Sequence, residues 1–364
     1  NSKLIRDVKN ENSAKGKALK LLEEANLLIP QGEKQEKIIH KAQMVKCAER
    51  SGSAIEIIPT SQWFVKLIDK KEALKKKGAE VAWHPQHMKI RLDQWIDGLK
   101  EDWCISRQRF FGVPFPVWYD KDGKPVYPSP DQLPVDPLRD TPKGYYKDDL
   151  TPDIDVMDTW ATSSISPQIN AKSLSAGKLF PADLRPQAHE IIRTWAFYTI
   201  AKAHLHSNQI PWTNIMISGW CLAADKTKMS KSKGNVVTPV ALIEDKGADA
   251  VRYWASTSRL ATDTAFSEDL LKIGKKLVGK IWNASNLIAQ LPAPSTKHQA
   301  PSTREALDRW ILSRLHAAIT KATAAFEQFE YCDARVAIED FFWNDFCDNY
   351  LELVKARAYE GNAS

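Results

Sequence analysis

Apolar residues recur at helical spacing in several separate segments near the start of the chain. Residues 14–28, 61–78 and 88–99 each carry an amphipathic pattern of the kind that forms one face of a helix. Gly78 is placed where a glycine would end the second of these helices. Residues 53–59 read as a short strand before it. The pattern therefore predicts three helices and one strand in the first hundred residues.

The middle of the chain changes to a β pattern and then alternates. In residues 115–128, Asp122 and Gly123 stand between two runs rich in β-forming residues, which is a hairpin signal. A buried strand end at 155–161, a long helix at 190–206 and a buried strand at 213–220 follow. This order is typical of the βαβ units of a parallel sheet.

The last third of the chain reads as helical. From Pro239 onward amphipathic patterns continue to the end, with one interruption at 291–302. This linker is the clearest domain boundary in the sequence. The chain is thus expected to contain an α/β region followed by a helical bundle.

Composition narrows the class of protein only slightly. A chain of 364 residues with 43% hydrophobic and 26% charged residues can hold two or more globular domains. The net charge of +6 permits an anionic partner such as RNA or a nucleotide. The five cysteines include no C-x-x-C pair, which favours a reducing compartment over a disulfide framework. No apolar run approaches the length of a membrane span, and the start resembles no signal peptide.

One short stretch carries an unusual composition. Residues 226–235, KTKMSKSKGN, place four lysines and two serines in ten residues directly after the predicted strand at 213–220. Open α/β sheets bind ligands beyond the carboxyl ends of their strands. Lys228 and Lys231 can converge on a polyphosphate, and Gly234 lets the backbone turn. From the residues alone, the alternative is a solvated basic loop, which is what most lysine-rich surface segments are.

The string KMSKS, Lys228 to Ser232, is a signature of class I aminoacyl-tRNA synthetases, and it is present here without substitution. Further segments resemble the valyl branch of that class, namely residues 61–66, 102–119, 155–164, 189–200 and 341–355. The resemblance covers practically the whole chain in the expected order. It implies an α/β fold class: the second half of a class I Rossmann-type nucleotide-binding fold, followed by an all-α helical bundle.

The resemblance also implies a division into domains. Residues 1–58 are expected to be the tail of an inserted editing domain and its return connection. Residues 59–235 are expected to be the second half of the catalytic domain with the KMSKS loop. Residues 236–292 would form a connecting helical region that contacts the tRNA stem, and residues 303–364 the start of an anticodon-binding domain.

The activity implied by the resemblance is the ligation of valine to tRNA(Val). Valine and ATP give valyl-adenylate and pyrophosphate, and the acyl group then passes to the 3′ end of the tRNA. Charge builds on the phosphates as pyrophosphate leaves, so positioned cations stabilise the transition state. Lys228 and Lys231 are expected to be the catalytic cations, with Lys231 preferred. Mg²⁺ is expected to accompany ATP.

Other positions are expected to contact ATP because they match the same motifs or flank them. Where relatives show Gly-x-Asp contacting the ribose, this chain has Ala188, His189 and Glu190, and a carboxylate at 190 can still accept from ribose hydroxyls. The expected ATP-binding residues are Met229, Ser230, Ser232, Gly219, Trp220, Glu190 and His189.

Two tryptophans are expected to form walls of the amino-acid pocket, as the tryptophans of the matching motifs do in the family. Trp160 and Trp195 could form a narrow apolar slot for a β-branched side chain. Without the resemblance, both would be interpreted as core tryptophans. The motifs give no such support for Trp63, Trp95, Trp103 and Trp118, which are interpreted as packing residues.

The sequence predicts no bound metal. Residues 47–51, CAERS, lie where some relatives carry a cysteine pair for zinc, but Ser51 and the lack of a second thiol leave no zinc site. Arg107 and Arg109 are interpreted as conformational or salt-bridge residues. The expected partners are valine, ATP and tRNA(Val), without membrane or DNA, and the expected location is the cytoplasm.

The other class I signature, H-x-G-H, is absent, since none of the eight histidines fits that motif. In the family it lies upstream, so the chain is expected to be a fragment that is inactive alone. The competing hypothesis is a non-catalytic tRNA-binding module derived from a synthetase. A tRNA-only module would have no reason to keep Trp160, Trp195 and an intact KMSKS string together.

Overall fold

The computed structural model describes residues 59–173, 179–230, 234–290 and 305–359, and before them only residues 17, 20–22, 24–25, 46–48 and 52–55. The chain divides into two compact units, Asn1–Gln62 and Trp63–Ser364. In the first unit, residues 20–22 are helical, and Cys47 forms an antiparallel bridge with Ala54. The rest of the predicted helix at 14–28 and strand at 53–59 lies largely outside the described residues.

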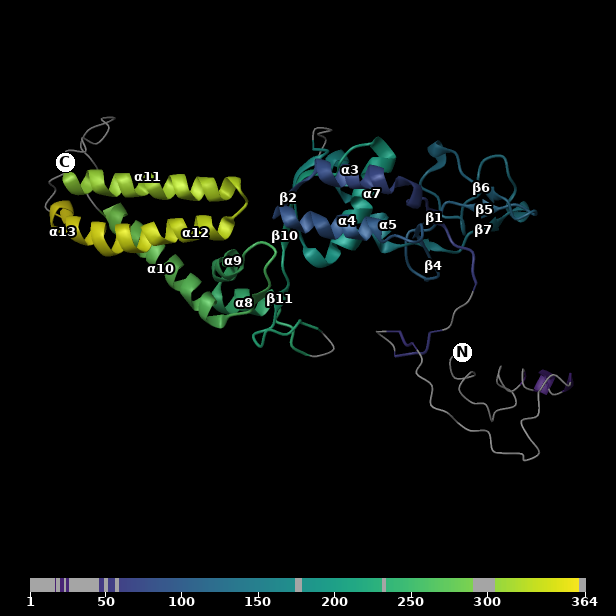
Figure 1. Cartoon of the computed structure of the whole chain (residues 1–364), viewed down its shortest axis with the longest axis horizontal. Coiled ribbons are helices and arrows are strands. Elements are labelled where there is room, and N and C mark those ends of the chain that lie inside the picture. The colour runs from purple at the N-terminus through teal and green to yellow at the C-terminus, as the bar shows by residue number, and fades with distance from the viewer. Residues whose placement is uncertain are drawn as a thin grey trace, which may run out of the picture. The chain divides into compact units, whose positions relative to one another are not determined.

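The second unit is built on a small parallel sheet. Strand β10 (Trp212–Ser218) lies in the centre, with β2 (Ala82–His84) on one side and β9 (Ala182–Ala188) on the other (Figure 1). In β10, Trp212, Ile215 and Ile217 are buried. A central strand in a parallel sheet is covered on both faces, which explains its apolar sequence.

The strand that precedes the long helix is not the one predicted. Residues 155–161 form β8 (Val156–Met157), which pairs antiparallel with β4 (Ser106–Arg107), and then the start of a short helix. The parallel strand is β9, where only Gln187 is buried. Its polar residues and Pro186 hide it from a hydrophobicity pattern, because a strand with one free edge tolerates both.

Three helices pack together beside the sheet: α3 (Lys71–Glu80), α4 (Lys89–Asp97) and α7 (Phe197–Ser207) (Figure 1). Leu74, Leu92, Ile96 and Ile200 are almost fully buried between them. These residues lie at helical spacing, so the amphipathic pattern at 88–99 predicted α4 correctly.

The helix predicted at 61–78 is shorter at its start and longer at its end. The chain first forms strand β1 (Phe64–Val65) and a 3-10 turn at Ile68–Lys70, and α3 then continues past Gly78. Gly78 does not end the helix. A Cβ at this position would lie 2.6 Å from Leu92 Cδ2, so the glycine allows α3 to approach α4 closely.

The segment predicted as a helix at 190–206 has three parts. A 3-10 turn at His189–Ile191 leads into one π-helical turn at Ile192–Ala196 and then into α7. Asn208, with a φ of 53°, ends α7 in the left-handed conformation that a C-terminal cap requires.

The hairpin signal at Asp122 and Gly123 is confirmed. Strands β5 (Trp118–Tyr119) and β6 (Pro125–Val126) pair antiparallel, and Gly123 has a φ of 76° in the turn between them. Strand β7 (Thr151–Pro152) pairs with the other edge of β5.

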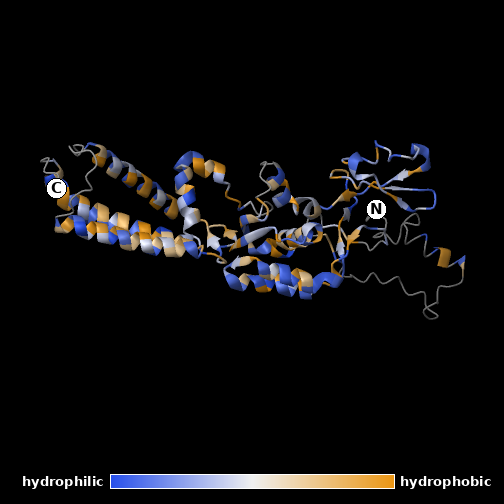
Figure 2. Cartoon of the chain, turned by 90° about the horizontal axis from the view of Figure 1, so that it is seen from above, coloured by the Kyte–Doolittle hydropathy of each residue, from blue (hydrophilic) through white to orange (hydrophobic). Residues whose placement is uncertain are grey.

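The C-terminal third is helical, as predicted. Its helices are α8 (Pro239–Lys246), α9 (Ala248–Ser256), α10 (Glu268–Gln290), α11 (Ala306–Glu327), α12 (Tyr331–Asp340), a π-helical segment (Phe341–Tyr350) and α13 (Leu351–Tyr359). Helices α11 and α12 lie side by side around Ala322, Ala334 and Ala337 (Figure 1). Apolar and polar stripes run along the long helices (Figure 2), in agreement with their amphipathic sequences.

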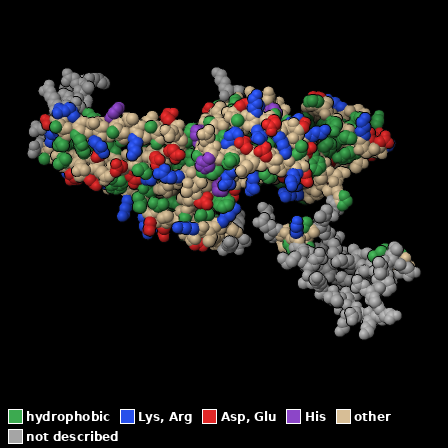
Figure 3. Space-filling view, viewed as in Figure 1, with side chains coloured by type: hydrophobic (Ala, Val, Ile, Leu, Met, Phe, Trp, Pro, Cys, Tyr) green, Lys and Arg blue, Asp and Glu red, His purple; other side chains and the backbone are tan. Residues whose placement is uncertain are grey.

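Sequence patterns missed one pairing in this region. Strand β11 (Cys221–Leu222) pairs parallel with β12 (Thr264–Ala265), which lies between α9 and α10. The remaining short elements are β3 (Trp103–Cys104), α5 (Thr159–Ser163) and α6 (Ser166–Ser173). None of the helices in the described part of the chain has the length and apolar character needed to span a bilayer. In the view of Figure 3, basic and acidic side chains are interspersed, so the excess positive charge forms no single patch on this face.

Candidate active site

Four of the sequence-predicted ATP-binding residues lie at the carboxyl edge of the parallel sheet. His189 and Glu190 directly follow β9, and Gly219 and Trp220 directly follow β10. Neighbouring parallel strands end at the same edge, which is where open α/β sheets bind ligands. A cleft of about 1000 Å³ opens there. It is lined by Met88, Ile90, Arg91, Gln94, Trp95, His189, Glu190, Arg193, Trp220, Ala261, Thr262 and Asp263.

Glu190 joins the two strand ends to the lysine-rich loop. Its Oε2 accepts a hydrogen bond of 2.8 Å from Trp220 Nε1 and lies 3.3 Å from Lys228 Nζ. The Lys228 ammonium also lies 4.6 Å from the centroid of the Trp220 ring, within the range of a cation–π contact. An exposed ion pair of this kind stabilises the fold little. Its effect is to hold a positive charge at the rim of the cleft.

His189 lies against the same tryptophan. Its Nδ1 is 3.3 Å from the Ser218 carbonyl oxygen, and its ring centroid is 4.8 Å from that of Trp220. A carbonyl oxygen can only accept, so Nδ1 carries the proton in this contact. In the neutral imidazole, Nε2 is then a hydrogen-bond acceptor in the wall of the cleft.

The loop that carries Lys228 begins with a tight turn. Ala223 N donates to Thr227 O at 2.9 Å, and Lys226 takes a φ of 64° between them. The side chain of Asn235 closes the loop from its other end. Its Oδ1 accepts from Ser230 N at 2.9 Å. Its Nδ2 donates to Thr227 Oγ1 at 3.0 Å and to the Lys228 carbonyl oxygen at 3.3 Å.

Only some of the predicted loop residues beyond Lys228 lie in the described part of the chain. Met229 and Ser230 are half-buried at the end of the described segment. Lys231 and Ser232 lie outside the described residues, so their roles stay predictions. Asn235 was missed by the sequence analysis, although it ends the stretch that drew attention, because a lone asparagine after a glycine is an ordinary turn signal.

Gly219 is required for a reason that the sequence did not reveal. In the structure, a Cβ at this position would lie 2.3 Å from the carbonyl carbon and oxygen of Thr262 and 2.5 Å from Asp263 N. The chain segment after α9 therefore fills the space beside Gly219.

Asp263 is a second residue that sequence patterns missed. Its Oδ1 accepts a hydrogen bond of 2.8 Å from Trp220 N, and the residue lines the cleft. The two residues are 43 positions apart, and no local pattern marks Asp263. The parallel pairing of β11 with β12 and the bridge between Ser218 and Leu260 bring them together.

The two tryptophans expected in the amino-acid pocket are placed differently from each other. Trp195 is buried and stacks on Trp212, with ring centroids 5.2 Å apart and an interplanar angle of 6°. The Arg185 guanidinium lies 3.5 Å from the Trp195 centroid, and burial lowers the pKa of Arg185. Trp195 lines a smaller cavity of about 280 Å³, whereas Trp160 is half-buried at the start of α5.

The structure does not bring these two rings together. Among the described residues, no ring contact joins Trp160 to Trp195, and neither side chain lines the larger cleft. Both belong to the hydrophobic cluster at the sheet. Their proposed pocket role therefore stays a prediction.

Arg107 is a salt-bridge residue, as interpreted from the sequence. Its Nη2 lies 3.2 Å from Asp158 Oδ1, and the Asp158 carboxylate also accepts from Trp160 N at the start of α5. An anionic cap at a helix start is favourable. The pair thereby fixes the helix that carries Trp160.

Trp95, interpreted as a packing residue, also lines the cleft. It packs edge-on against Phe197 at 6.4 Å between centroids, and the guanidinium carbon of Arg193 lies 6.0 Å from its ring. Arg193 is exposed and was also missed. Its charge, together with that of Arg91, makes part of the cleft wall cationic.

In the part of the chain that the structure describes, no three His, Cys, Asp or Glu side chains gather to hold a metal ion. Cys47 is exposed, and residues 49–51 lie outside the described part. The predicted lack of zinc at 47–51 stays a prediction.

The fold and the site define a parallel α/β protein with a basic loop beyond the end of its central strand, β10. Solved structures share this fold. A LeuRS of Agrobacterium radiobacter K84, in a ternary complex with tRNA and LeuAMS, matches with a TM-score of 0.59 and 23% identity over 71% of this chain and 37% of its own. The methionyl-tRNA synthetase of Mycobacterium tuberculosis, bound by methionyl-adenylate, matches with a TM-score of 0.56 and 22% identity over 85% of this chain and 56% of its own.

The family is identified by sequence. The model of the class I tRNA synthetases (I, L, M and V) matches residues 7–267, and that of the anticodon-binding domain of tRNA ligases matches residues 308–364. This chain belongs to the class I tRNA synthetases. The fold class expected from the resemblance, a Rossmann-type fold followed by a helical region, is confirmed.

Curated relatives match almost the whole chain. A valine–tRNA ligase of Wolbachia pipientis wMel is 52% identical over 98% of this chain and 43% of its own length. One of Ehrlichia canis (strain Jake) is 54% identical over 95% of this chain and 42% of its own. The chain thus spans less than half the length of these relatives.

Proposed function

We propose that this chain is part of an enzyme with valine–tRNA ligase activity. In this reaction valine and ATP form valyl-adenylate, and the valyl group is then transferred to tRNA(Val). The observation that supports this most directly is the position of Lys228. Its ammonium is held by Glu190 and Trp220 at the carboxyl edge of a parallel sheet. The names of the relatives point to valine and to tRNA as substrates. The cytoplasm is the expected location.

Each residue at the cleft has a proposed task toward ATP. Glu190 Oε2 is occupied by Trp220 and Lys228, while Oε1 has no hydrogen-bond partner in the described part of the chain. Oε1 is therefore proposed to accept from a ribose hydroxyl. His189 Nε2 can accept from a second donor. Met229, Ser230, Ser232, Gly219 and Trp220 are proposed to complete the ATP site.

Lys228 and Lys231 are proposed to act on the phosphates. The negative charge on the leaving pyrophosphate grows in the transition state, and an ammonium placed beforehand stabilises that charge more than the ground state. When bound, Mg²⁺ supplies further positive charge on the ATP phosphates, which commonly carry it. Trp160 and Trp195 are proposed to bound the valine side chain.

The parts after the loop have proposed roles toward tRNA. Residues 236–292 would contact the tRNA stem, and residues 303–364 the anticodon region. Binding through phosphates releases counterions, so affinity should fall steeply with added salt.

The proposal is tested with a chimera, in which this chain replaces the matching part of the Wolbachia ligase. The measurements are valine-dependent ATP–pyrophosphate exchange and valylation of tRNA(Val). Exchange is expected in the chimera and absent from the 364-residue chain alone, because its sequence holds no H-x-G-H signature. A folded chimera that binds tRNA(Val) but gives no exchange would favour the non-catalytic tRNA-binding module instead.

Lys231→Ala in the chimera tests the chemistry. Loss of a charge-assisted contact made in the transition state should slow single-turnover adenylate formation by roughly 30- to 1000-fold at saturating ATP and valine. Lys226→Ala, in the same loop, is the matched control and should stay within about threefold of the parent. Equal rates for the two variants would contradict a catalytic role for Lys231.

A further inference from the structure

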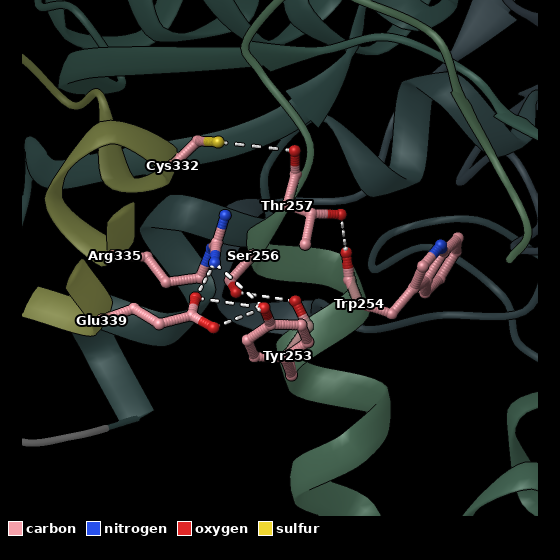
Figure 4. A network of polar contacts seen from close by, with 7 residues as sticks. All are labelled: Tyr253, Trp254, Ser256, Thr257, Cys332, Arg335 and Glu339. Atoms are coloured by element: carbon pink, nitrogen blue, oxygen red, sulfur yellow. Dashed lines mark hydrogen bonds and ion pairs between the residues drawn. The ribbon is translucent and has the colours of Figure 1, made fainter. Parts of the chain in front are cut away.

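The segment between α9 and β12, residues 257–263, contacts two different parts of the chain. Tyr253, at the end of α9 before this segment, points its hydroxyl at α12. The hydroxyl lies 2.9 and 3.0 Å from the two carboxylate oxygens of Glu339 and 3.2 Å from Arg335 Nη1 (Figure 4). Arg335 also forms an ion pair with Glu339. The end of α9 is therefore tied to α12 by a closed polar network.

The next residues continue the same contact. Arg259 meets Asp333 with two parallel hydrogen bonds, 2.6 Å from Nη2 to Oδ1 and 3.1 Å from Nη1 to Oδ2. The Arg259 guanidinium holds the pKa of Asp333 below its ordinary value. Ser258 Oγ lies 2.7 Å from the Tyr331 hydroxyl. A bidentate arginine–carboxylate pair fixes orientation as well as distance, so this part of the segment has a defined position on α12.

Beyond Arg259, the segment turns to the sheet and the cleft. Ala261 N donates to Ile217 O at 2.8 Å, which places the segment on the carboxyl end of β10. Trp220 N donates to Asp263 Oδ1 at 2.8 Å, and Thr264 N donates to Trp220 O at 2.9 Å. The backbone of Trp220 is thus held on both sides by residues of this segment.

The backbone of the segment is tightly packed against the backbone of Gly219. The ideal Cβ position of Gly219 lies 2.3 Å from the Thr262 carbonyl carbon and oxygen, so the two backbones are in direct contact. A displacement of the segment must therefore move Trp220. Trp220 in turn donates to Glu190 and lies under Lys228.

We propose that Asp263 is a positioning residue for the cleft, and that the Arg259–Asp333 pair fixes the segment which carries it. Asp263 orients Trp220 through its backbone N–H, and Trp220 orients Glu190 and Lys228 through its indole. The helical bundle is thereby connected to the proposed ATP site through a continuous series of polar contacts. The inference rests on the proposed function only for the identity of the cleft's ligand.

The connection is tested by amide hydrogen exchange in the 364-residue chain, which needs no catalysis. Arg259→Ala should speed exchange of the Trp220 and Thr264 amides by about threefold or more, because local opening of the segment becomes easier. Arg252→Ala is the matched control, since Arg252 pairs with Asp249 in its own helix. The control should change neither amide. Unchanged exchange in Arg259→Ala would overturn the proposal.

A charge swap distinguishes the loss of the Arg259–Asp333 pair from a general loss of stability. The double variant Arg259→Asp with Asp333→Arg should return the Trp220 amide to within about 1.5-fold of the parent rate. Exchange of the Ile96 amide in α4 reports on the fold as a whole and should be the same in every variant. A swap that exchanges as fast as Arg259→Ala, with Ile96 unchanged, would contradict the proposal.

The positioning role of Asp263 is tested by its conservative variant in the chimera. Asp263→Asn keeps an oxygen that can accept from Trp220 N and should retain pyrophosphate exchange within about threefold. Asp263→Ala removes the acceptor and should lose about tenfold or more. Equal loss in both variants would exclude positioning through this hydrogen bond. A chimera without any exchange would count against the proposed function, and the hydrogen-exchange result would still decide the connection.

Discussion

The indole N–H of Trp220 donates a hydrogen bond of 2.8 Å to Glu190 Oε2. Neither residue lies in a regular strand, yet each is held at the end of one, on neighbouring parallel strands. The indole therefore fixes which carboxylate oxygen faces Lys228 and which one faces the cleft. The first prediction therefore concerns a single hydrogen-bond donor, the indole N–H of Trp220.

Trp220→Phe removes the N–H donor and keeps a ring beneath Lys228. Glu190 then loses one of its two contacts and samples other rotamers, so its oxygen is less well placed for a ribose hydroxyl. In the chimera, we expect the KM for ATP in pyrophosphate exchange to rise about 3- to 10-fold, equivalent to roughly 0.65–1.4 kcal/mol. Trp118→Phe, whose indole donates to Pro137 O away from the cleft, is the control. A KM equal to that of the control would refute the assigned role.

Asn235→Asp tests the closure of the loop. The carboxylate can still accept from Ser230 N, but it cannot donate to Thr227 Oγ1 or to the Lys228 carbonyl oxygen. Lys228 should be less well oriented, and single-turnover adenylate formation should slow by about tenfold, with little change in ATP affinity. Thr227→Ser keeps the hydroxyl and should remain close to the parent rate. If both variants react at the parent rate, Asn235 does not orient the loop.

Gly274 and Gly279 offer a matched pair in α10. A Cβ on Gly274 would lie 2.7 Å from Tyr253 Cβ and 2.9 Å from its Cγ, whereas Gly279 has nothing within 4 Å. Gly274→Ala should lower the free energy of unfolding by about 1–3 kcal/mol, because the helices must separate. Gly279→Ala should raise it by up to about 1 kcal/mol through helix propensity alone. Urea unfolding measures both, and changes of the same sign would contradict this packing.

The stability of the fold depends on pH in part through the carboxyl group of Asp102. The backbone N–H groups of Ile68 and Leu67 hold the pKa of the Asp102 carboxyl below its ordinary value of 3.8. A carboxyl with a lowered folded-state pKa stabilises the fold above its unfolded-state pKa, and this stabilisation is lost as pH falls through the folded-state value. Asp102→Asn should therefore lower Tm at pH 7, and the difference from the parent should shrink below about pH 4. A difference that is constant from pH 7 to pH 3 would show that the charge is not involved.

Sequence patterns predicted the elements whose apolar residues repeat regularly. Helix α4, strand β10 and the hairpin at Gly123 follow directly from spacing and turn chemistry. Strand β9 was missed because it lies at the edge of the described three-stranded sheet, where Pro186 and polar residues cost little. Local patterns carry no information about such an edge.

The candidate site was predictable to the extent that it lies at strand ends. The loop lysines, Gly219 and Trp220 were found from their position after the strand at 213–220. His189 and Glu190 were found only through the resemblance to class I synthetases, because β9 itself was missed. Asp263 was not, because its contact with Trp220 depends on the path of the chain through α8 and α9. The packing requirement for a glycine at position 219 was missed for the same reason. Its close neighbour Thr262 belongs to that distant segment.

The polar contacts of the cleft and its connection join residues far apart in the chain. Glu190 and Trp220 are 30 positions apart, Trp220 and Asp263 are 43 apart, and Arg259 and Asp333 are 74 apart. During synthesis the N-terminal residues leave the ribosome first, and each long loop must close before its contact forms. The nascent chain thus exposes β9 and β10 before the segments that fix Trp220 exist. The cleft can mature only after the segment around Asp263 has been made, so a ligand of the cleft cannot assist the earlier folding of the sheet.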